Sequence, residues 1–486
     1  MKNLKNILSG IKPIKVIGDK NLSLSGLAFD SRKVEKDFLF VAMRGTQVDG
    51  HNFILKAIES GANSIVCEEV PQKINPDICY ILVNDSQESL GLLASNWYNN
   101  PSKKLKLVGV TGTNGKTTTA SLLHCLFTDL GYSCGLLSTI ENKIENKIFK
   151  ATHTTADALQ INALLAKMVD ANCSHCFMEV SSHALAQKRI AGLEFDGGIF
   201  TNLTHDHLDF HKTVAEYIKA KKSFFDGLAK SAFALTNVDD KNGMIMLQNC
   251  KAQKRTYSIK QLADFKARII ENQISGLHMQ IDGQDIYCRL VGKFNAYNLL
   301  AIYGTARLLG ESEEEILPAL SNLESVAGRF DYQQSPEGII AIVDYAHTPD
   351  ALENVLETIN QLQSEDGKII TVVGAGGDRD KSKRPEMARI AAQLSNRLIL
   401  TSDNPRSENP ETILADMQTG LNEEQKKRSL QITNREEAIK TAFFLSQKGD
   451  VILIAGKGHE NYQEINGVRH HFDDKEIINK LFKKTH

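Results

Sequence analysis

The sequence predicts a multidomain α/β protein with mainly parallel sheets, and three observations support this prediction. The chain has 486 residues, and at roughly 150 residues per domain it should form about three domains. Short apolar runs typical of buried strands alternate with helical stretches, which is the pattern of parallel strands joined by helices. Residues 108–120 indicate an apolar strand, a glycine-rich turn and the start of a helix, the local structure of a phosphate-binding loop.

Breaks in the apolar pattern predict the domain boundaries. The first domain, residues 1–104, ends at a polar segment, and the second, 105–330, begins with the strand before the glycine-rich turn. The third, 331–486, follows Gly328-Arg-Phe-Asp331, and its first strand is expected at 339–343. The other expected strands are 24–29, 38–42, 65–67, 80–83, 105–110, 175–180, 198–203, 233–238, 369–373, 397–401 and 451–455.

Composition excludes several functional classes. The chain has 57 Lys and Arg against 59 Asp and Glu, a net charge of −2, which provides no basic field for nucleic acid. No apolar run approaches the roughly 18 residues that cross a bilayer, and the N-terminal apolar stretch is too short for a signal peptide. We therefore expect a cytoplasmic protein with small partners, which binds no nucleic acid and does not insert into a membrane.

Eight cysteines are spread along the chain and do not form a disulfide framework, which agrees with a reducing compartment. Cys173 and Cys176 have the spacing of a metal or redox pair. However, an apolar run follows them and no second pair stands at zinc spacing. Buried thiols before a core strand are therefore favoured over a metal site.

The phosphate loop contains residues whose chemistry suits a nucleotide. Gly112 and Gly115 let backbone N–H groups converge on phosphate oxygens, Lys116 adds a positive charge, and the Thr117 hydroxyl can ligate Mg²⁺. The loop is shorter than the common pattern, because Val110 stands where the first glycine is usual. The alternative is an ordinary strand-turn-helix unit that happens to contain a lysine.

Polar residues recur at or just after the ends of the apolar strands. Open α/β sheets bind ligands beyond the carboxyl ends of their strands, so these residues are expected to line one or two facing clefts. They are Glu179, Asn202, Asp344, Gly374, Asp403 and Gly456.

Two of these segments offer ligands for a metal. Glu179 ends an apolar strand, where an unpaired carboxylate would be costly, and His207 lies among carboxylates in residues 204–211. Mg²⁺ on a nucleotide takes mainly oxygen ligands, which this set could supply with one nitrogen. A structural carboxylate and a merely polar loop are the competing interpretations.

Six segments, taken in order along nearly the whole chain, resemble the motif series of the Mur ligases, ATP-dependent amino-acid ligases that assemble the peptidoglycan stem peptide. The segments are 112–118, 179–183, 201–209, 292–298, 328–329 and 344–349. The resemblance implies an N-terminal domain for a UDP-sugar, a central ATPase and a Rossmann-like C-terminal domain that brings the amino acid. It also implies that ATP phosphorylates a substrate carboxylate and that an amine attacks the acyl phosphate.

The resemblance assigns the ATP and metal sites residue by residue. It implies two Mg²⁺ ions, with Thr117, Glu179 and His207 as ligands, and Lys116, Glu179, His207 and Lys221 as the catalytic set. Lys221 matches a lysine that CO₂ carbamylates (N6-carboxylysine) to face the second Mg²⁺, although Lys219 and Lys222 leave the register open, and a solvated helix face is the alternative. The ATP set is Gly112, Thr113, Asn114, Gly115, Lys116, Thr117, Thr118, Asn295, Asn298, Arg329, Asp344 and His347.

The resemblance also assigns two substrate sites. The site for UDP-N-acetylmuramoyl-L-alanyl-D-glutamate consists of Phe29, Ser31, Thr46, Gln47, Val48, Thr154, Thr155, Ser181, Gln187 and Arg189. The site for meso-2,6-diaminopimelate consists of Arg379, Asp403, Asn404, Pro405, Arg406, Gly456 and Glu460. A threonine pair such as Thr154 and Thr155 is often only a helix N-cap.

Residues 403–406, Asp-Asn-Pro-Arg, are similar to the diaminopimelate-recognition motif. Diaminopimelate differs from lysine by one distal carboxylate, which the Arg406 guanidinium can bind through two hydrogen bonds. The alternatives are a post-strand turn with a solvated arginine, a lysine-adding relative, a folate polyglutamylating enzyme, a nucleotide-sugar-binding module without catalysis, and a phosphate-loop switch without ligase activity. We expect a monomeric ligase of the diaminopimelate-adding type.

Overall fold

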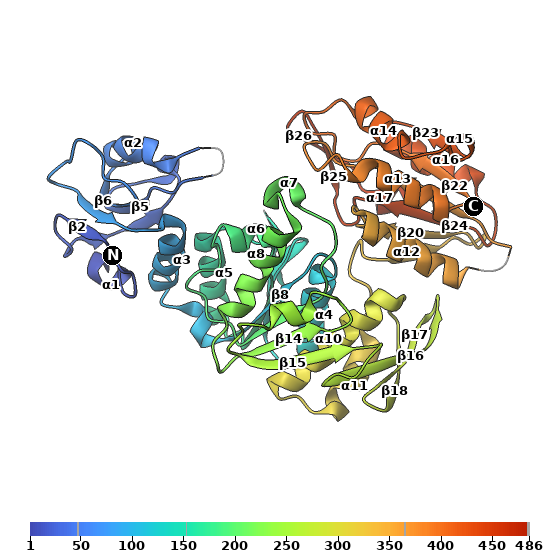
Figure 1. The fold of residues 1–486 in the computed structure, drawn as a ribbon, viewed down its shortest axis with the longest axis horizontal. Coiled ribbons are helices and arrows are strands. Elements are labelled where there is room, and N and C mark those ends of the chain that lie inside the picture. The colour runs from blue at the N-terminus through green and yellow to red at the C-terminus, as the bar shows by residue number, and fades with distance from the viewer. Residues whose placement is uncertain (46–47, 152, 364–365, 484–486) are drawn as a thin grey trace.

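The computed structural model describes residues 1–45, 48–151, 153–363 and 366–483. It contains three large sheets, which we call the N-terminal, central and C-terminal sheets. They occupy three units in chain order, with the N-terminal unit at one end of the molecule (Figure 1). The predicted α/β class with mainly parallel sheets is confirmed.

The central sheet has 11 strands in the order β11-β10-β9-β12-β8-β13-β14-β15-β16-β17-β18. The pairs from β9 to β16 are parallel, while β10–β11 and β16–β18 add antiparallel hairpins at the two edges. Its strands are β8 Lys106–Thr111, β9 Cys134–Leu137, β10 Glu141–Ile144, β11 Lys147–Lys150, β12 His175–Glu179, β13 Gly197–Phe200, β14 Phe233–Asn237, β15 Gln253–Ser258, β16 Phe265–Gln273, β17 Gly276–Ile281 and β18 Gln284–Cys288.

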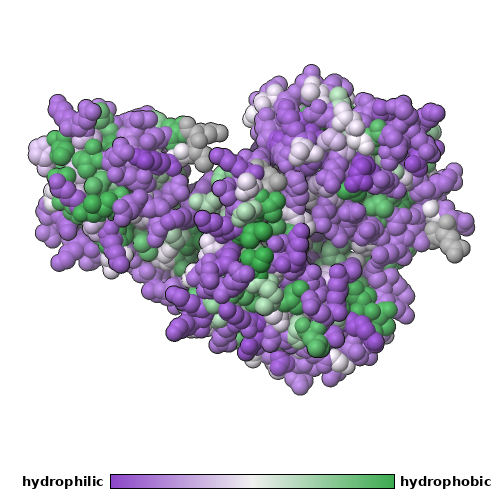
Figure 2. All heavy atoms as spheres, in the orientation of Figure 1, coloured by the Kyte–Doolittle hydropathy of each residue, from purple (hydrophilic) through white to green (hydrophobic). Residues whose placement is uncertain are grey.

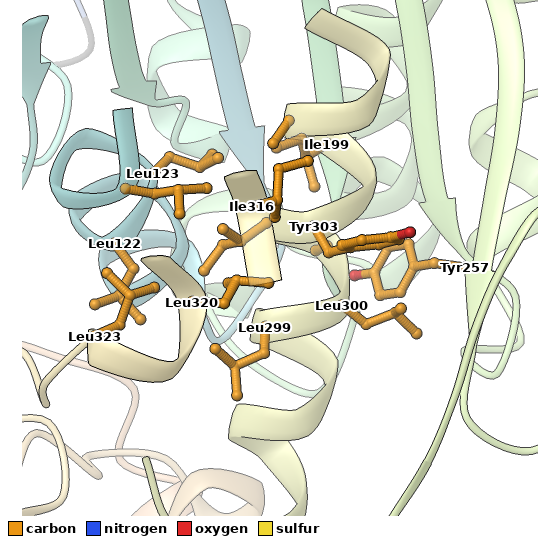
Figure 3. Packing of buried hydrophobic residues seen from close by; sticks show 14 of the residues in the cluster. Leu122, Leu123, Ile199, Tyr257, Leu299, Leu300, Tyr303, Ile316, Leu320 and Leu323 are labelled. Atoms are coloured by element: carbon orange, nitrogen blue, oxygen red, sulfur yellow. The ribbon is translucent and has the colours of Figure 1, made fainter. Parts of the chain in front are cut away.

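Helices cover both faces of the central sheet, as its two-sided apolar strands require. One face packs on α4 (Lys116–Asp129), α10 (Lys293–Leu309) and α11 (Glu313–Asn322). In Figure 3, Leu299 and Leu300 of α10 lie among leucines of the neighbouring helices, with Tyr257 and Tyr303 close by. The other face packs on α5 (Ala158–Asp170), α6 (Ser182–Ala186), α8 (Val214–Asp226) and α9 (Gly243–Met246).

The C-terminal sheet has the order β19-β20-β24-β21-β22-β23, parallel except for β19 against β20. Helices again cover both faces, which gives the Rossmann-like arrangement expected from the sequence. The strands are β19 Asp331–Gln334, β20 Ile340–Asp344, β21 Ile369–Val373, β22 Arg397–Leu400, β23 Ser429–Gln431 and β24 Val451–Ala455, and β25 Tyr462–Ile465 and β26 Val468–His471 form a separate hairpin. The helices are α12 Pro349–Leu362, α13 Lys383–Leu394, α14 Pro410–Gln418, α15 Glu423–Lys427, α16 Arg435–Leu445 and α17 Asp474–Lys483.

The N-terminal sheet has the order β2-β7-β6-β5-β4, and only β2 against β7 is antiparallel. Its strands are β2 Lys15–Ile17, β4 Gly26–Ala28, β5 Phe38–Val41, β6 Ala62–Cys67 and β7 Cys79–Leu82, while β1 Lys2–Asn3 pairs with β3 Ser23–Leu24. The longer helices α2 (Ile54–Glu59) and α3 (Ser86–Trp97) join α1 (Leu4–Ile7) in packing against it.

The apolar runs located most buried strands within one or two residues, although β6 begins three residues before the run at 65–67 and β13 ends three residues before the end of the run at 198–203. Two predictions need correction, and the hairpins of the central sheet were not predicted. The run at 24–29 contains two separate strands, β3 and β4. The C-terminal sheet begins with the polar strand β19, not with 339–343, because β19 lies at an edge and alternates between half-buried and exposed residues. The hairpins of the central sheet have the same half-exposed pattern and produce no continuous apolar run. The boundaries at 104 and 330 stay predictions.

The prediction that Cys173 and Cys176 are buried thiols is confirmed, and both are free. Cys173 precedes β12, whereas Cys176 lies inside this strand. No helix among the residues described has the length and apolar character needed to cross a bilayer. The face of the molecule shown in Figure 2 is mostly hydrophilic. Hydrophobic residues gather on it over the N-terminal unit and in a band over the central unit.

Truncation of Leu299 should destabilise the central unit. Leu299 is fully buried in α10, so Leu299→Ala should cost about 2–5 kcal/mol of unfolding free energy through lost packing and a residual cavity. A urea titration followed by circular dichroism measures the loss. Leu262→Ala is the matched control, since Leu262 is 87% exposed, and equal effects of the two changes would contradict this account of the core.

Candidate active site

One cleft of about 1410 Å³ lies between the central and C-terminal units. The carboxyl ends of β8, β12, β13 and β14 open into it from one side, and those of β20, β21, β22 and β24 from the other. All six strand-end residues named from the sequence line this single cleft: Glu179, Asn202, Asp344, Gly374, Asp403 and Gly456. The strand-end pattern therefore predicted the location of the cleft.

The phosphate loop joins β8 to α4 at the floor of this cleft. Gly115 precedes the helix with a φ of +83°, and a Cβ there would stand 2.7 Å from Asn298 Oδ1. At Gly112 a Cβ would stand 1.9 Å from Thr201 Oγ1. Both positions therefore require glycine. The loop backbone lies at the N-terminus of the 14-residue helix α4, where N–H groups can bind an anion.

Lys116 and Thr117 extend from the first turn of α4. Lys116 Nζ donates to the carbonyl oxygens of Gly112 and Thr113 at 3.0 and 2.7 Å. Burial holds the pKa of Lys116 below its ordinary value. An anionic phosphate in the loop would favour the charged ammonium, so binding of a nucleotide and ionisation of this lysine support each other.

The Glu179 carboxylate connects three segments of the central unit. It accepts hydrogen bonds from Thr117 Oγ1 at 3.0 Å and from the Thr139 backbone N–H at 2.7 Å. The Glu179 carbonyl oxygen accepts a further bond from Thr155 Oγ1 at 2.8 Å. A hydroxyl and a carboxylate placed together at the phosphate loop are the oxygen ligands that Mg²⁺ prefers, so these residues fit that ion.

Lys221 lies inside α8 and is 1% exposed. Its Nζ donates to the Gly112 carbonyl oxygen at 2.7 Å and sits 4.6 Å from the centre of the Tyr217 ring. Burial, with a smaller contribution from Lys116, holds the pKa of Lys221 well below its ordinary value. Lys219 is exposed and Lys222 forms an ion pair with Asp226, so Lys221 is the lysine of this segment that faces the cleft.

His207 lies on the loop after β13 with a positive φ of 55°. Its Nε2 is 3.3 Å from an Asp206 carboxylate oxygen, and its ring packs edge-on against His183 at 4.8 Å. Burial lowers the pKa of His207, which favours the neutral imidazole that a metal ligand requires. Among the described residues, no three His, Cys, Asp or Glu side chains form a ready metal cluster, so phosphate and water oxygens would have to complete any Mg²⁺ site.

Asn295 and Asn298 begin α10 beside the phosphate loop. Asn298 Nδ2 donates to Asn295 Oδ1 at 3.1 Å, and Thr119 Oγ1 donates to Asn298 Oδ1 at 3.4 Å. Both asparagines are buried and line the cleft. They are therefore not exposed helix-surface residues.

Four contacts hold the C-terminal unit and its connecting segment against the central unit, two at the phosphate loop and two at the loop after β13. Arg329 Nη2 donates to Thr117 Oγ1 at 3.1 Å, and Asn114 Nδ2 donates to Asp350 Oδ2 at 2.8 Å. Weaker ion pairs join His205 to Asp380 and Asp206 to Lys383 at 3.8 and 4.0 Å.

Asp344 and His347 lie on the C-terminal side of this junction. An Asp344 carboxylate oxygen accepts a 2.7 Å hydrogen bond from the Phe330 backbone N–H. His347 Nδ1 contacts the Tyr345 carbonyl oxygen at 2.8 Å, and the Tyr345 ring lies 4.4 Å from the Arg329 guanidinium carbon. Asp344, His347 and Arg329 all line the cleft, as the sequence predicted.

The residues expected at the sugar-nucleotide peptide fall into two groups. Thr154, Thr155, Ser181 and Arg189 line the cleft, and Arg189 donates to Gln187 Oε1 at 2.9 Å. Phe29, Ser31 and Val48 belong to the N-terminal unit and do not line this cleft. Thr46 and Gln47 lie outside the described residues.

The C-terminal wall holds the Asp403–Arg406 turn. Asn404 Nδ2 donates to Glu460 Oε2 at 2.7 Å, and Arg406 Nη1 donates to the Gly377 carbonyl oxygen at 2.6 Å. Arg406 has a positive φ of 53°, and its backbone pairs with β25. Arg406, Arg379, Gly456 and Glu460 all line the cleft. Pro405 is buried and does not line the cleft.

Sequence reasoning missed several residues that shape the site. Thr139, which binds Glu179, lies just past the end of β9, so the strand-end pattern could have found it. Lys457 lies between Gly456 and Glu460, which were both expected to bind the amino acid, but the sequence assigned it no role. Asp350 and Lys383 carried no local signal, because their importance comes from contacts between two units.

A phosphate loop at the carboxyl edge of a parallel sheet, facing a second α/β unit with its own charged turn, defines a nucleotide-binding enzyme that brings two substrates together. Three family models match: "Mur ligase family, catalytic domain" at residues 23–98, "Mur ligase middle domain" at 110–306 and "Mur ligase, glutamate ligase domain" at 328–458. The chain belongs to the Mur ligase family.

Two curated relatives and one solved structure show which kind of Mur ligase this chain resembles. The chain is 57% identical to the UDP-N-acetylmuramoyl-L-alanyl-D-glutamate–2,6-diaminopimelate ligase of Cytophaga hutchinsonii, over 98% of both chains. It is 55% identical to the ligase of the same name from Bacteroides fragilis, over 99% of both chains. A solved structure of a ligase of this name superposes with a TM-score of 0.71 at 32% identity, covering 100% of this chain and 99% of that one.

Gly115→Ala should weaken nucleotide binding at least tenfold, because its Cβ would displace Asn298 from the loop. Titration with a fluorescent ATP analogue measures the change. The matched control is Gly131→Ala, where φ is +90° but nothing lies within 4 Å of the added Cβ; it should cost about 1 kcal/mol of stability and leave affinity unchanged. Wild-type affinity in the Gly115 variant would contradict the proposed contact.

Proposed function

We propose that this chain is an ATP-dependent ligase that joins meso-2,6-diaminopimelate to the γ-carboxylate of D-glutamate in UDP-N-acetylmuramoyl-L-alanyl-D-glutamate, a step of peptidoglycan synthesis. The observation that carries the proposal is the single cleft in which the phosphate loop faces the Asp403–Arg406 turn across two units. The names of the relatives at 55–57% identity support the same substrates.

The central wall activates the carboxylate. An ionised carboxylate is a poor electrophile, so transfer of the ATP γ-phosphate to it supplies a leaving group. The loop backbone and Lys116 bind the phosphates, and Asn295 and Asn298 lie where the adenine would stack beside α10. Arg329, already bonded to Thr117, adds positive charge from the connecting segment.

Thr117, Glu179 and His207 are the proposed ligands for Mg²⁺, which when bound neutralises charge on the phosphoryl oxygens. A second ion would face Lys221 in its carbamylated form. Carbamylation requires CO₂ and a neutral amine, and the depressed pKa of the buried Lys221 supports both the modification and its position beside the loop.

The C-terminal wall recognises the acceptor. Arg406 and Arg379 present guanidinium groups for carboxylates, while Glu460 and Asn404 offer oxygen atoms to an ammonium group. Lysine lacks the distal carboxylate and would leave Arg406 unpaired, so the lysine-adding alternative is disfavoured. A nucleotide switch is also disfavoured, because it would not need this charged wall.

The sugar nucleotide would extend from Arg189, Ser181 and the Thr154–Thr155 pair toward Phe29, Ser31 and residues 46–48 of the N-terminal unit. The eight cysteines are free thiols, which supports a reducing compartment, and we propose that the enzyme works as a monomer in the cytoplasm, where ATP is supplied.

The purified protein should release phosphate from ATP in the presence of Mg²⁺ and the UDP-muramoyl dipeptide only when an acceptor is added. Meso-diaminopimelate should be preferred over L-lysine by about 100-fold in kcat/KM, since lysine leaves a buried polar partner unsatisfied. Arg406→Ala should abolish most of this preference. Phosphate release that ignores the acceptor would contradict the ligase, and equal wild-type rates with both acceptors would contradict the role of Arg406.

Lys221→Ala should lose at least 100-fold of the ligase rate because it removes the proposed carbamate. Small carboxylates such as formate or acetate should restore part of the activity by occupying the space left by the side chain. The matched control is Lys219→Ala, an exposed neighbour in α8, which should remain active. Full activity of Lys221→Ala would disprove the proposed role.

A further inference from the structure

Lys457 is a buried cation that the ligase chemistry described above leaves without a role. It follows β24 and its side chain is 0% exposed. Its Nζ lies 3.2 Å from Glu460 Oε2 and 3.3 Å from Asn404 Oδ1, and 5.4 Å from the centre of the Tyr462 ring. Lys457 therefore contacts Glu460 and Asn404, the two residues proposed to bind the acceptor ammonium group, but does not itself line the cleft.

Lys457 belongs to a buried network of charges. Arg435 and Asp474 form an ion pair with both side chains fully buried, joined at 2.8 Å. Burial raises the pKa of the Asp403 carboxyl, but Lys457, Arg435 and Arg406 together hold it below its ordinary value. Three carboxylates, Asp403, Glu460 and Asp474, thus face the buried cations Lys457 and Arg435, with Arg406 as the third cation. Once the Arg406 guanidinium binds a carboxylate of the acceptor, one negative charge of the network has no cationic partner in the protein.

Two carboxylates of this network, Asp403 and Glu460, line the cleft. Asp403, Asp474, Lys457 and Arg435 are almost completely buried, whereas the Glu460 side chain is 15% exposed, so Glu460 is the carboxylate most accessible from the cleft. Buried charges are retained where a partner compensates them. The partner that this cluster lacks is a small cation arriving from the cleft.

We propose that Lys457 is a positioning residue that holds Glu460 and Asn404 as the receptor for the distal ammonium group of the acceptor. This inference rests on the proposed function and deepens it, because it assigns the two charged groups at the distal end of the acceptor to different residues. Arg406 binds the distal carboxylate, while the cluster organised by Lys457 binds the ammonium group on the same carbon atom.

The charge on Glu460 depends on its surroundings. Burial and the neighbouring Asp403 raise the pKa of Glu460, and Lys457 acts in the opposite direction. The other charged or titratable groups that interact with Glu460 are Arg435, Tyr345 and Tyr462. Without Lys457, the pKa of Glu460 would rise further, which favours the protonated carboxyl and weakens its attraction for an ammonium group.

Two acceptors separate this role from a merely structural one. Meso-diaminopimelate carries the distal ammonium group, and 2-aminopimelate has a hydrogen atom in its place. The ratio of their kcat/KM values in the wild-type enzyme measures ammonium recognition. A charge-assisted hydrogen bond to a buried group predicts a ratio of about 10 or more.

Lys457→Met should reduce this ratio at pH 7 about tenfold, mainly through the KM of meso-diaminopimelate, while the KM of ATP stays within about twofold. The ratio should recover in part as the pH is raised, because a higher pH favours the ionised form of Glu460. Glu460→Gln should show the same loss without recovery, and the double variant should be no worse than Glu460→Gln alone. Lys440→Met, an exposed lysine on α16, is the matched control and should keep the wild-type ratio.

If Lys457→Met does not fold, Lys457→Gln provides the same comparison, because it keeps a donor toward Asn404 and Glu460 and removes only the charge. An unchanged ratio in the folded variant would overturn the inference while wild-type turnover upholds the proposed function. An equal loss with both acceptors would likewise overturn it. Absence of acceptor-dependent turnover in the wild type would overturn the proposed function and this inference together.

Discussion

The Glu179 carboxylate is the contact on which the arrangement of the cleft depends. A carboxylate at the end of a buried strand must be compensated, and Glu179 meets this requirement with donors from α4 and from the segment after β9. Its carbonyl oxygen holds Thr155, whose hydroxyl in turn receives the Ser181 N–H. One residue therefore sets the phosphate loop and the peptide-binding segment at fixed positions relative to each other.

In the C-terminal wall, buried carboxylates are compensated by charged side chains and not by neutral hydrogen-bond donors. Asp403 and Glu460 lie close together, and Lys457 and Arg435 make their ionised forms tolerable. The central wall thus carries cations and backbone N–H groups at the phosphate loop, whereas the C-terminal wall combines guanidinium groups with carboxylates. We propose that this asymmetry lets the cleft hold a polyanion at one wall and a zwitterion at the other.

Sequence predicted the parts of the molecule that local chemistry determines. Continuous apolar runs such as 369–373 can only be two-sided buried strands, and polar residues directly after them had to meet at the sheet edge. The edge strand β19 and the hairpin β16–β18 escaped detection, because half-exposed strands carry polar residues at every other position. Asp350 and Lys383 could not be assigned, since they contact Asn114 and Asp206 of the central unit only after the two units have packed together.

The hydrogen bond between Asn114 and Asp350 has a consequence for how this chain can change over generations. The two residues stand 236 positions apart, yet loss of the amide would leave a half-buried carboxylate, whose pKa burial already raises, without its donor. A substitution at either position therefore creates selection for a compensating change at the other. Asn114 and Asp350 are expected to covary among descendants of this sequence, although one belongs to the phosphate loop and the other to the C-terminal unit.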